Sequence, residues 1–377
     1  MKKFFYLFLA ICTFAACQRE RSVSVEVRNP ADFDRNSEIV EVPMEEVAGK
    51  LQLADTAEIV ILDETGQQIP YQITFDNRII FPASVKAGEQ AGYTIKAGTP
   101  ELFTVSSCGK EYPEAMNDIA WENDRMAFRI CGATKETTAT EADGYDLWVK
   151  NSEDPVLDIL YESGRMKRDS CRSVPALGAG TTALYVDNVL VYPGYYQTEE
   201  ILDNGPLRFT VMLTYHPFVV KGDSGVVETR VISLDKGSQL NKTIVYFKNL
   251  KQPQTLATGI ELHEPDAGNY FADAKNGYIG YADRANPGAE NGVKYVGAVF
   301  PSNVKETRPV LVSPSEADKR GVCGHLVAFS DYLPDSDFVY YWGAGWSEFG
   351  FSSMDGWTRY LNDFARKVRN PMVVTLK

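Results

Sequence analysis

The sequence predicts an all-β protein, and three observations lead to this prediction. Short runs in which apolar and polar residues alternate recur along most of the 377 residues, and alternation is the period of a half-buried strand. Polar turns separate these runs, as antiparallel hairpins require. Only residues 354–369 repeat apolar side chains at helical spacing, whereas a parallel α/β fold would need helices between its strands.

Residues 1–16 have the pattern of an export signal. Two lysines are followed by an apolar run at residues 4–14 and by small residues before Cys17. This run is too short to stay in a bilayer as an anchor, so we expect it to be cleaved. The ending Phe-Ala-Ala-Cys is typical of a bacterial lipobox, which predicts lipidation of Cys17 and a short tether over residues 17–21. An ordinary secretory signal with an incidental cysteine is the alternative.

The chain is acidic, with 38 Lys and Arg against 51 Asp and Glu and a formal net charge of −13. This balance disfavours nucleic acid as a partner, because nucleic-acid binding needs a basic stripe. It does not exclude an acidic glycan, provided that the binding pocket is locally basic. No later apolar segment approaches the length of a membrane-spanning helix, and nothing in the sequence predicts an oligomeric state.

The six cysteines form no metal-binding pattern. They include no CxxC spacing and no neighbouring pair of histidines, so we predict no metal site and no cofactor. Calcium held by loop carboxylates is left open, but no motif supports it. An oxidising compartment permits disulfides, and Cys108 with Cys131 is then the expected pair. Buried free thiols fit the sequence equally well.

Residues 22–105 are predicted to form a small β-sandwich. Residues 22–27 alternate, and residues 58–62 and 71–75 are short strands bounded by turn residues. None of these residues has a catalytic pattern. We interpret this part as an immunoglobulin-like module with a structural role.

Residues 106–377 continue in longer strands and are predicted to form a broad antiparallel sandwich. The most regular strand is at residues 207–216, and a plain polar turn separates the strands at residues 226–234 and 240–247. The helix expected at residues 354–369 has an apolar face, with Asp355 as a candidate N-cap, and is expected to pack on the sheets.

A polar cluster surrounds the strand predicted at residues 126–130. It combines three carboxylates, an indole and two arginines: Asp118, Trp121, Glu122, Asp124, Arg125 and Arg129. Arginine binds carboxylates through paired hydrogen bonds, and an indole offers a flat face to a sugar ring. Neighbouring carboxylates also suit glycoside hydrolysis, with Glu122 as the catalytic candidate. An internal ion-pair network that fixes the strand is an equally good interpretation.

Three segments carry a resemblance to a known family: residues 113–132 (PEAMNDIAWENDRMAFRICG), 204–218 (NGPLRFTVMLTYHPF) and 342–350 (WGAGWSEFG). From about residue 22 onward the chain resembles uncharacterised Bacteroidetes lipoproteins that are described only as a domain of unknown function and are often encoded near glycan-degrading enzymes. The resemblance implies a β-supersandwich like that of galactose mutarotases, in which a histidine and a carboxylate flank the sugar. Surface-exported lipoproteins of this group tend to carry an acidic run after the cysteine. The mixed charges at residues 18–21 therefore imply an outer-membrane anchor that faces the periplasm.

The three histidines supply further catalytic candidates. His216 ends the strand at residues 207–216, and alternation places Glu261 and His263 on one face. A neighbouring carboxylate tunes an imidazole for acid–base catalysis near neutral pH. We therefore predict that His216, Glu261 and His263 are catalytic together with Glu122, whereas His325 carries a weaker signal. Packed histidines and surface contacts give the same pattern.

Two further stretches are predicted to contact substrate. The loop at residues 160–180 is the most basic part of the chain, and its Arg168 would attract uronate or sulfate groups. Trp342 and Trp346, on either side of a Gly-Ala-Gly turn, would form an aromatic floor for a sugar. A solvated loop and a buried core strand are the corresponding alternatives.

These patterns favour an exported lipoprotein that acts on carbohydrate, as a glycoside hydrolase or a polysaccharide lyase on oligosaccharides that include acidic sugars. A lyase would use Arg125 or Arg129 to neutralise a uronate, and His216 or the tyrosine-rich residues 192–196 as the base. A serine hydrolase is disfavoured because no GxSxG motif is present. A glycan-binding lipoprotein without activity and a sugar mutarotase or epimerase are the alternatives.

Overall fold

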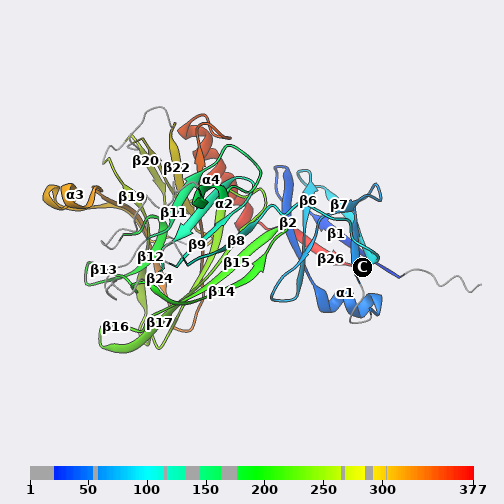
Figure 1. Cartoon of the computed structure of the whole chain (residues 1–377), viewed down its shortest axis with the longest axis horizontal. Helices are drawn as coiled ribbons and strands as arrows, with labels where there is room; N and C mark the ends of the chain where they lie inside the picture. Colours follow the sequence, from blue (N-terminus) through cyan, green and yellow to red (C-terminus); the bar gives the residue numbers. More distant parts are fainter. Residues whose placement is uncertain are drawn as a thin grey trace, which may run out of the picture.

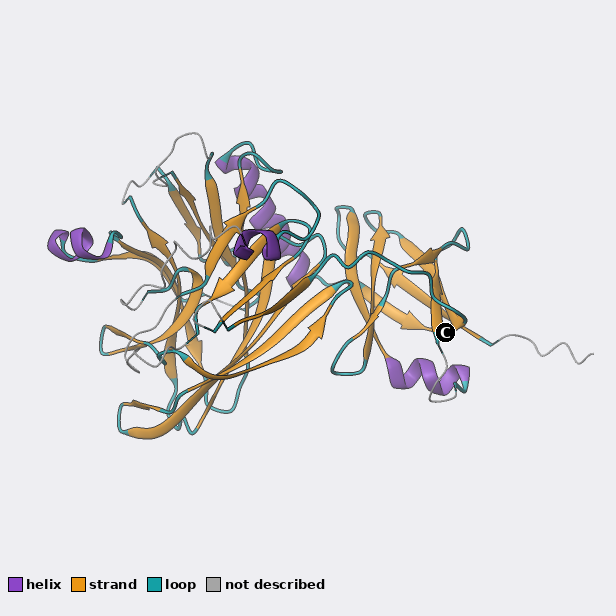
Figure 2. Cartoon of the chain, viewed as in Figure 1, coloured by secondary structure: helices purple, strands orange, loops and turns teal. Residues whose placement is uncertain are grey.

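The structure is a computed structural model that describes residues 21–53, 58–113, 117–132, 144–162, 176–264, 268–284, 292–302 and 304–377. A smaller and a larger β-sandwich lie end to end (Figure 1). Antiparallel strands dominate both of them (Figure 2), so the predicted all-β class is confirmed.

The smaller sandwich consists of two antiparallel sheets and a helix. The five-stranded sheet has the order β26-β1-β7-β3-β4 and contains β1 (Ser22–Arg28), β3 (Ile59–Leu62), β4 (Gln68–Ile69), β7 (Gln90–Ala97) and β26 (Val373–Leu376). The three-stranded sheet has the order β2-β6-β5 and contains β2 (Arg35–Pro43), β5 (Gln72–Ile73) and β6 (Arg78–Val85). Helix α1 (Met44–Leu51) follows β2. Alternate apolar side chains of β1, β6 and β7 form the core between the sheets.

The C-terminal strand β26 belongs to the smaller sandwich, although the sequence predicted residues 106–377 as one larger unit. It pairs antiparallel with β1, where Val374 lies opposite Val27. This pairing covers a sheet edge that β1 would otherwise expose. The chain therefore leaves the smaller sandwich after β7 and returns to it at its end (Figure 1).

The larger sandwich contains three antiparallel sheets. The nine-stranded sheet contains β14 (Tyr196–Asn204), β15 (Arg208–Tyr215), β16 (Phe218–Val220), β17 (Asp223–Asp235), β18 (Leu240–Lys248), β20 (Tyr270–Asp273), β21 (Tyr278–Asp283), β22 (Lys294–Val299) and β25 (Phe338–Trp346). The five-stranded sheet has the order β13-β12-β19-β24-β23 and contains β12 (Ala179–Val186), β13 (Val189–Val191), β19 (Gln254–Leu262), β23 (Glu306–Leu311) and β24 (Gly324–Tyr332). The four-stranded sheet has the order β11-β10-β9-β8 and contains β8 (Cys108–Tyr112), β9 (Asp118–Glu122), β10 (Met126–Ile130) and β11 (Asp146–Val149).

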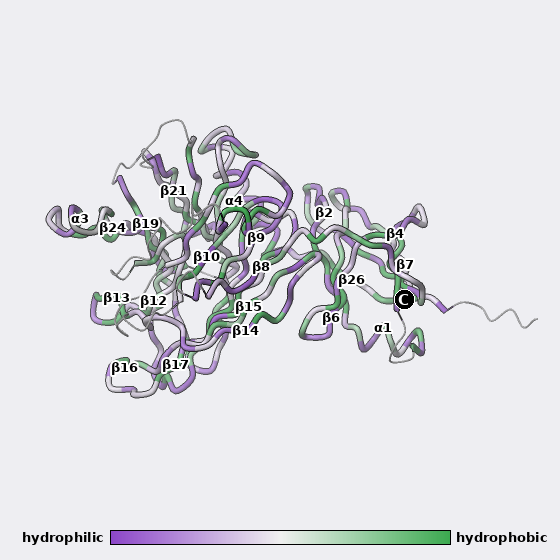
Figure 3. The backbone as a smooth tube through the Cα atoms, in the orientation of Figure 1, coloured by the Kyte–Doolittle hydropathy of each residue, from purple (hydrophilic) through white to green (hydrophobic). Residues whose placement is uncertain are grey.

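The three sheets of the larger sandwich share one main core. Inward residues of β9, β10, β12, β15, β19 and β25 meet there, as the alternation of apolar and polar residues predicts. Hydrophobic and hydrophilic stretches recur along the strands of both sandwiches (Figure 3). The ring of Trp121 stacks 6.0 Å from that of Phe209, which joins the four-stranded sheet to the nine-stranded sheet. The five-stranded sheet of the larger sandwich packs one face on this core, and the cavity described below lies on its other face.

One helix was predicted, and four are present among the described residues. Helix α4 (Met354–Arg369) has the predicted bounds, although Ser353 rather than Asp355 is its N-cap. It packs on the outside of the nine-stranded sheet, where Nε1 of Trp357 donates to the carbonyl of Val296 at 3.1 Å. Helices α1, α2 (Leu157–Glu162) and α3 (Pro314–Arg320) have 8, 6 and 7 residues, which is too short for a helical period to be recognised.

Candidate functional site

The predicted polar cluster at residues 118–130 is folded into the interior. Every residue of β9 and β10 is buried, with one face in the main core and the other under α2. Glu122 is 1% exposed, and its carboxylate lies 2.6 Å from Nζ of Lys150. It also accepts the backbone N–H groups of Val156 and Leu157 at 2.8 and 2.9 Å, at the start of α2. Glu122 therefore holds α2 in place, which corrects its predicted catalytic role.

Asp118 and Arg129 form a second buried ion pair. Nη1 of Arg129 lies 3.3 Å from Oδ2 of Asp118, and Nη2 lies 2.5 Å from Oδ2 of Asp146. The guanidinium also lies 4.7 Å from the ring centroid of Trp148. Burial raises the pKa of Asp118 to about 6, although the charge of Arg129 opposes this shift. Both side chains are almost fully buried in this network of the protein's own groups, which corrects their predicted role in substrate binding.

The other members of the cluster are also engaged within the protein. Oδ1 of Asp124 accepts the backbone N–H of Gly237 at 2.6 Å. Arg125 is part-exposed and lies 3.5 Å from Asp124 and 3.3 Å from Glu153. Trp121 is fully buried, and its Nε1 donates to Oδ1 of Asn241 at 2.7 Å. The cluster is therefore the internal ion-pair network that the sequence analysis gave as the alternative to a binding site.

Trp342 is a core residue and not part of a sugar floor. It is fully buried, its ring lies 4.0 Å from that of Tyr145 in parallel stacking, and its Nε1 donates to Oγ1 of Thr243 at 2.8 Å. Trp346 is part-exposed at the end of β25, opposite Lys294 of β22. The predicted aromatic pair is therefore wrong, because the faces of Trp342 are already covered.

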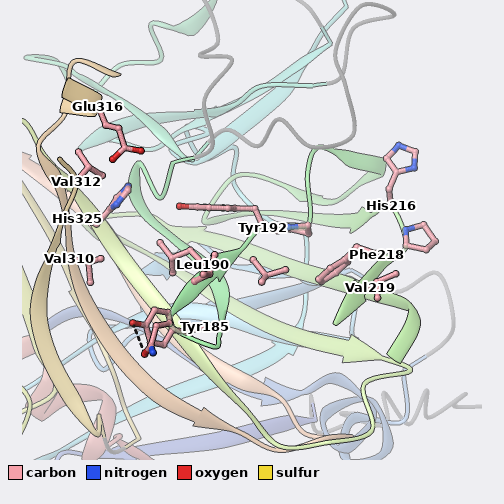
Figure 4. A pocket seen from close by; sticks show the side chains of 15 residues that line it. Tyr185, Leu190, Tyr192, His216, Phe218, Val219, Val310, Val312, Glu316 and His325 are labelled. Atoms are coloured by element: carbon pink, nitrogen blue, oxygen red, sulfur yellow. Dashed lines mark hydrogen bonds between the residues drawn. The ribbon is translucent and has the colours of Figure 1, made fainter. Parts of the chain in front are cut away.

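A cavity of about 860 Å³ lies on the outer face of the five-stranded sheet β13-β12-β19-β24-β23 of the larger sandwich (Figure 4). Its walls come from the β12–β13 hairpin, the chain from His216 into β16, the end of β23, and α3. The apolar lining includes Val189, Leu190, Phe218, Val219, Val310 and Val312. The polar lining includes Tyr185, Asn188, Tyr192, His216, Glu316 and His325. This size and mixture are typical of a site for a small organic molecule.

The register of the sheet places a carboxylate beside one imidazole of the cavity. Glu261 of β19 lies opposite His325 of β24, which lies opposite Val310 of β23. His325 is 4% exposed, and its Nε2 accepts the backbone N–H of Leu177 at 3.2 Å. That nitrogen is therefore an acceptor in this arrangement. The sequence paired Glu261 with His263 on one strand face, and the register adds His325 as the cross-strand neighbour of Glu261.

Tyr185 is fixed at the floor of the cavity by Arg308. Nη2 of Arg308 donates to the Tyr185 hydroxyl at 3.2 Å, and the guanidinium lies 4.7 Å from the ring centroid of Phe329. Nε of Arg308 lies 2.9 Å from Oε1 of Glu306. The guanidinium is therefore already engaged by a carboxylate and two aromatic side chains.

The two histidines predicted to be catalytic lie apart. His216 is exposed at the end of the cavity opposite His325 and Glu316, with Tyr192 between them in the view of Figure 4. His263 is not among the described lining residues, and its Nδ1 lies 3.4 Å from Oδ2 of Asp283. Of the predicted catalytic residues, His216 alone lines the cavity, and Glu261 lies next to a lining residue.

Cys17 and Arg168 lie outside the described residues. Cys108 is a free thiol whereas Cys131 is disulfide-bonded, so the expected pair is not formed. Burial raises the pKa of the Cys108 thiol to about 11, which makes it unreactive.

Within the described ranges, no cluster of three or more His, Cys, Asp or Glu residues could hold a metal ion. No helix in that part of the chain is long and apolar enough to cross a membrane.

Sequence reasoning missed Tyr185 and Glu316. Tyr185 follows the buried Leu184, so alternation places it on the outer face, but nothing local marks that face as a cavity. Glu316 was visible as part of Ser-Pro-Ser-Glu, the capping box that starts α3 at Ser313. That motif predicts a helix start and says nothing about a ligand.

Comparison with known proteins places this chain in a family. A curated relative, Uncharacterized protein P7 of Formosa agariphila, is 22% identical over 402 residues, which covers 99% of this chain and 98% of the relative. Two solved Enterococcus faecalis structures, an α-mannosidase and a protein in glycosyl hydrolase family 38, share the fold with TM-scores of 0.51 and 0.50, each at 9% identity. Each match covers 94% of this chain. It covers 46% of the first solved chain and 47% of the second, so this chain spans about half the length of each. Residues 27–374 match the model of the family described as Domain of unknown function (DUF4861), and the protein therefore belongs to that family.

Proposed function

We propose that this protein binds an oligosaccharide in the cavity on the outer face of the five-stranded sheet. The cavity carries the proposal, because it joins tyrosine rings, apolar walls and a few polar groups in a volume suited to sugar units. Sugar rings pack their C–H faces on aromatic rings, and their hydroxyls need donors and acceptors. The names of the two solved structures with this fold, an α-mannosidase and a glycosyl hydrolase, add support for a carbohydrate ligand.

Catalysis on the bound glycan, as a glycoside hydrolase or polysaccharide lyase, is the second candidate function. The observation that favours it is the cross-strand placement of Glu261 opposite His325, since a carboxylate and an imidazole are the groups of general acid–base catalysis. A mutarotase or epimerase would use the same pair. Asp118 and Glu122 do not support catalysis, because both carboxylates are held in buried ion pairs.

We also propose that the protein is exported and anchored through a lipid on Cys17, in the outer membrane and facing the periplasm. The pattern of residues 1–17 and the mixed charges at residues 18–21 support this location. Such an anchor would keep the glycan cavity close to oligosaccharides that enter the envelope.

The direct test is equilibrium binding of the purified mature chain to a panel of plant and host oligosaccharides. Tyr192→Ala should weaken binding roughly tenfold to a hundredfold, because an aromatic face is lost from the cavity. Tyr246→Ala is the matched control, since Tyr246 is 39% exposed on β18 and is not among the lining residues. The proposal fails if no glycan binds or if Tyr192→Ala binds like the wild type.

The same samples decide between binding and catalysis. Products are followed by mass and by the absorbance of unsaturated uronates, and anomer exchange is followed by NMR. A product that disappears in Glu261→Gln and His325→Gln, while both variants stay folded, supports an enzyme. Tight binding with no product in the wild type leaves the protein as a glycan-binding lipoprotein.

A further inference from the structure

A chain of polar side chains leads from β23 to the turn between β12 and β13 at the wall of the cavity. Oε1 of Glu306 lies 2.9 Å from Nε of Arg308, whose Nη2 donates to the Tyr185 hydroxyl at 3.2 Å. The Tyr185 hydroxyl donates to Oδ1 of Asn188 at 3.4 Å, the dashed line at Tyr185 in Figure 4. Tyr185 and Asn188 line the cavity, whereas Glu306 and Arg308 are not among its described lining residues. These four residues form a polar relay that ends in the cavity.

The chemistry of the relay fixes the direction of each hydrogen bond. A guanidinium can only donate, so the Tyr185 hydroxyl accepts from Arg308 and has its own hydrogen left for Asn188. An amide accepts a hydroxyl hydrogen only at its oxygen, and Oδ1 therefore faces Tyr185. The Nδ2 group, with its two N–H donors, is the half of the Asn188 side chain that can donate to a ligand.

The backbone of Asn188 is held in a tight turn. Asp187 and Asn188 are the two residues between β12 and β13. Their φ angles are 50° and 67°, in the left-handed region that two-residue hairpin turns need and that Asp and Asn tolerate. Nζ of Lys221, in the turn between β16 and β17, lies 3.1 Å from Oδ1 of Asp187 and ties the two turns together. The turn and the relay thus fix both ends of the Asn188 side chain.

We infer that Asn188 donates hydrogen bonds to the bound sugar, and that Arg308 is a positioning residue that acts on Asn188 through Tyr185. The inference rests on the proposed function and assigns roles within the same cavity. A donor of fixed direction selects a ligand that presents an acceptor at that place, such as a hydroxyl, ring or glycosidic oxygen. Because the amide is oriented before the ligand arrives, little rotational freedom is lost on binding.

The test begins with equilibrium binding to the purified mature chain. Titration calorimetry with cellotriose, xylotriose, mannotriose and trigalacturonate, followed by the rest of the oligosaccharide panel, identifies the ligand that the wild type binds most tightly. Asn188→Gly removes the amide but suits the turn, since glycine adopts positive φ freely. It should weaken binding of that ligand about threefold to tenfold, as expected for the loss of a hydrogen bond.

Arg308→Met tests the positioning role. Methionine keeps an unbranched apolar stem on Phe329 but cannot donate to Tyr185, so the hydroxyl and the amide are free to turn. Affinity should fall about twofold to fivefold in the wild-type background and should not change in the Asn188→Gly background. A merely structural effect of Arg308 would be the same in both backgrounds.

Two further measurements complete the test. Lys305→Met is the matched control, because it also removes one positive charge from an exposed ion pair, 2.7 Å from Asp331 and outside the described lining, and it should leave the affinity unchanged. In protein labelled with ¹⁵N-asparagine, the ligand should shift the two side-chain N–H signals of Asn188, which are assigned by their loss in Asn188→Gly. Arg308→Met should reduce that shift.

The outcomes separate the inference from the proposed function. Equal binding by the wild type and Asn188→Gly overturns the inference and leaves the proposed function standing. An equal loss for Arg308→Met in both backgrounds overturns the positioning role, because Arg308 would then act without Asn188. If the wild type binds no oligosaccharide of the panel, the proposed function and the inference fail together.

Discussion

Replacing Lys150 with methionine should destabilise the larger sandwich severely. Nζ of Lys150 lies 2.6 Å from Oε2 of Glu122 and donates to the carbonyls of Asn123 and Asp154 at 2.8 Å each. The side chains of Lys150 and Glu122 are both only 2% exposed. Lys150→Met would leave the Glu122 carboxylate buried without its counter-ion, and breaking such a pair costs about 3–5 kcal/mol.

This loss is large enough to measure by thermal unfolding. For a sandwich of this size it corresponds to a fall in Tm of roughly 10 °C. All five tryptophans lie beyond residue 105, so tryptophan fluorescence reports on the larger sandwich alone. Lys251→Met is the control, because Lys251 is 75% exposed and 3.9 Å from Asp223, and it should cost no more than about 1 kcal/mol.

A second substitution tests whether the effect belongs to the pair. Glu122→Gln keeps an oxygen to accept the N–H groups of Val156 and Leu157 but leaves the buried Lys150 ammonium without its counter-ion, so it should also destabilise the larger sandwich. The double variant should be less destabilised than the sum of the two single variants, since both act on one interaction. A Tm of Lys150→Met within about 1 °C of the wild type, together with lost turnover of a glycan, would refute the structural role assigned to Glu122.

Three further predictions concern other parts of the chain. Because burial raises the pKa of Asp118 to about 6 from an ordinary value of 3.8, the folded state binds its proton more tightly, and this group's contribution to stability falls as pH rises from about 4 to 6. Asp118→Asn should therefore flatten the dependence of Tm on pH across that window, and an unchanged slope would show that Asp118 does not titrate there. Cys17→Ala should move the protein from the membrane fraction to the soluble envelope fraction and abolish labelling with a radioactive fatty acid, whereas retained labelling would place the lipid elsewhere. Deleting residues 373–377 should expose the edge of β1 and make the smaller sandwich sensitive to limited proteolysis before the larger one, and equal resistance of the two would contradict the role of β26.

Local periodicity predicted most of the fold, because strands and one long helix carry their signals within a few residues. The alternation of Met126, Phe128 and Ile130 does place those side chains in the core. The opposite face, with Arg129, was expected to meet a ligand, but α2 covers it. Six residues of α2 are too few to be recognised, and whether a charged face meets solvent or a covering helix depends on long-range packing.

The candidate site was harder to predict, since it is assembled from segments far apart in the chain. Glu261 and His325 are neighbours only through the register of β19 and β24, which no local pattern encodes. An arginine and a carboxylate at strand spacing fit a binding floor and an ion pair equally well, and only burial distinguishes them, as Arg129 and Asp118 show. His216 was predicted as a site residue because it ends a long regular strand, and the end of that strand lies at the cavity.

Hydrogen–deuterium exchange with and without a bound oligosaccharide tests the central claim most directly. If the cavity over the five-stranded sheet is the glycan site, the ligand should slow exchange in the β12–β13 hairpin, at residues 216–220 and across residues 310–325, which together form its walls. Exchange at residues 118–130 should not change, because β9 and β10 are buried away from the ligand. Protection confined to residues 118–130, with none at the cavity walls, would contradict the account.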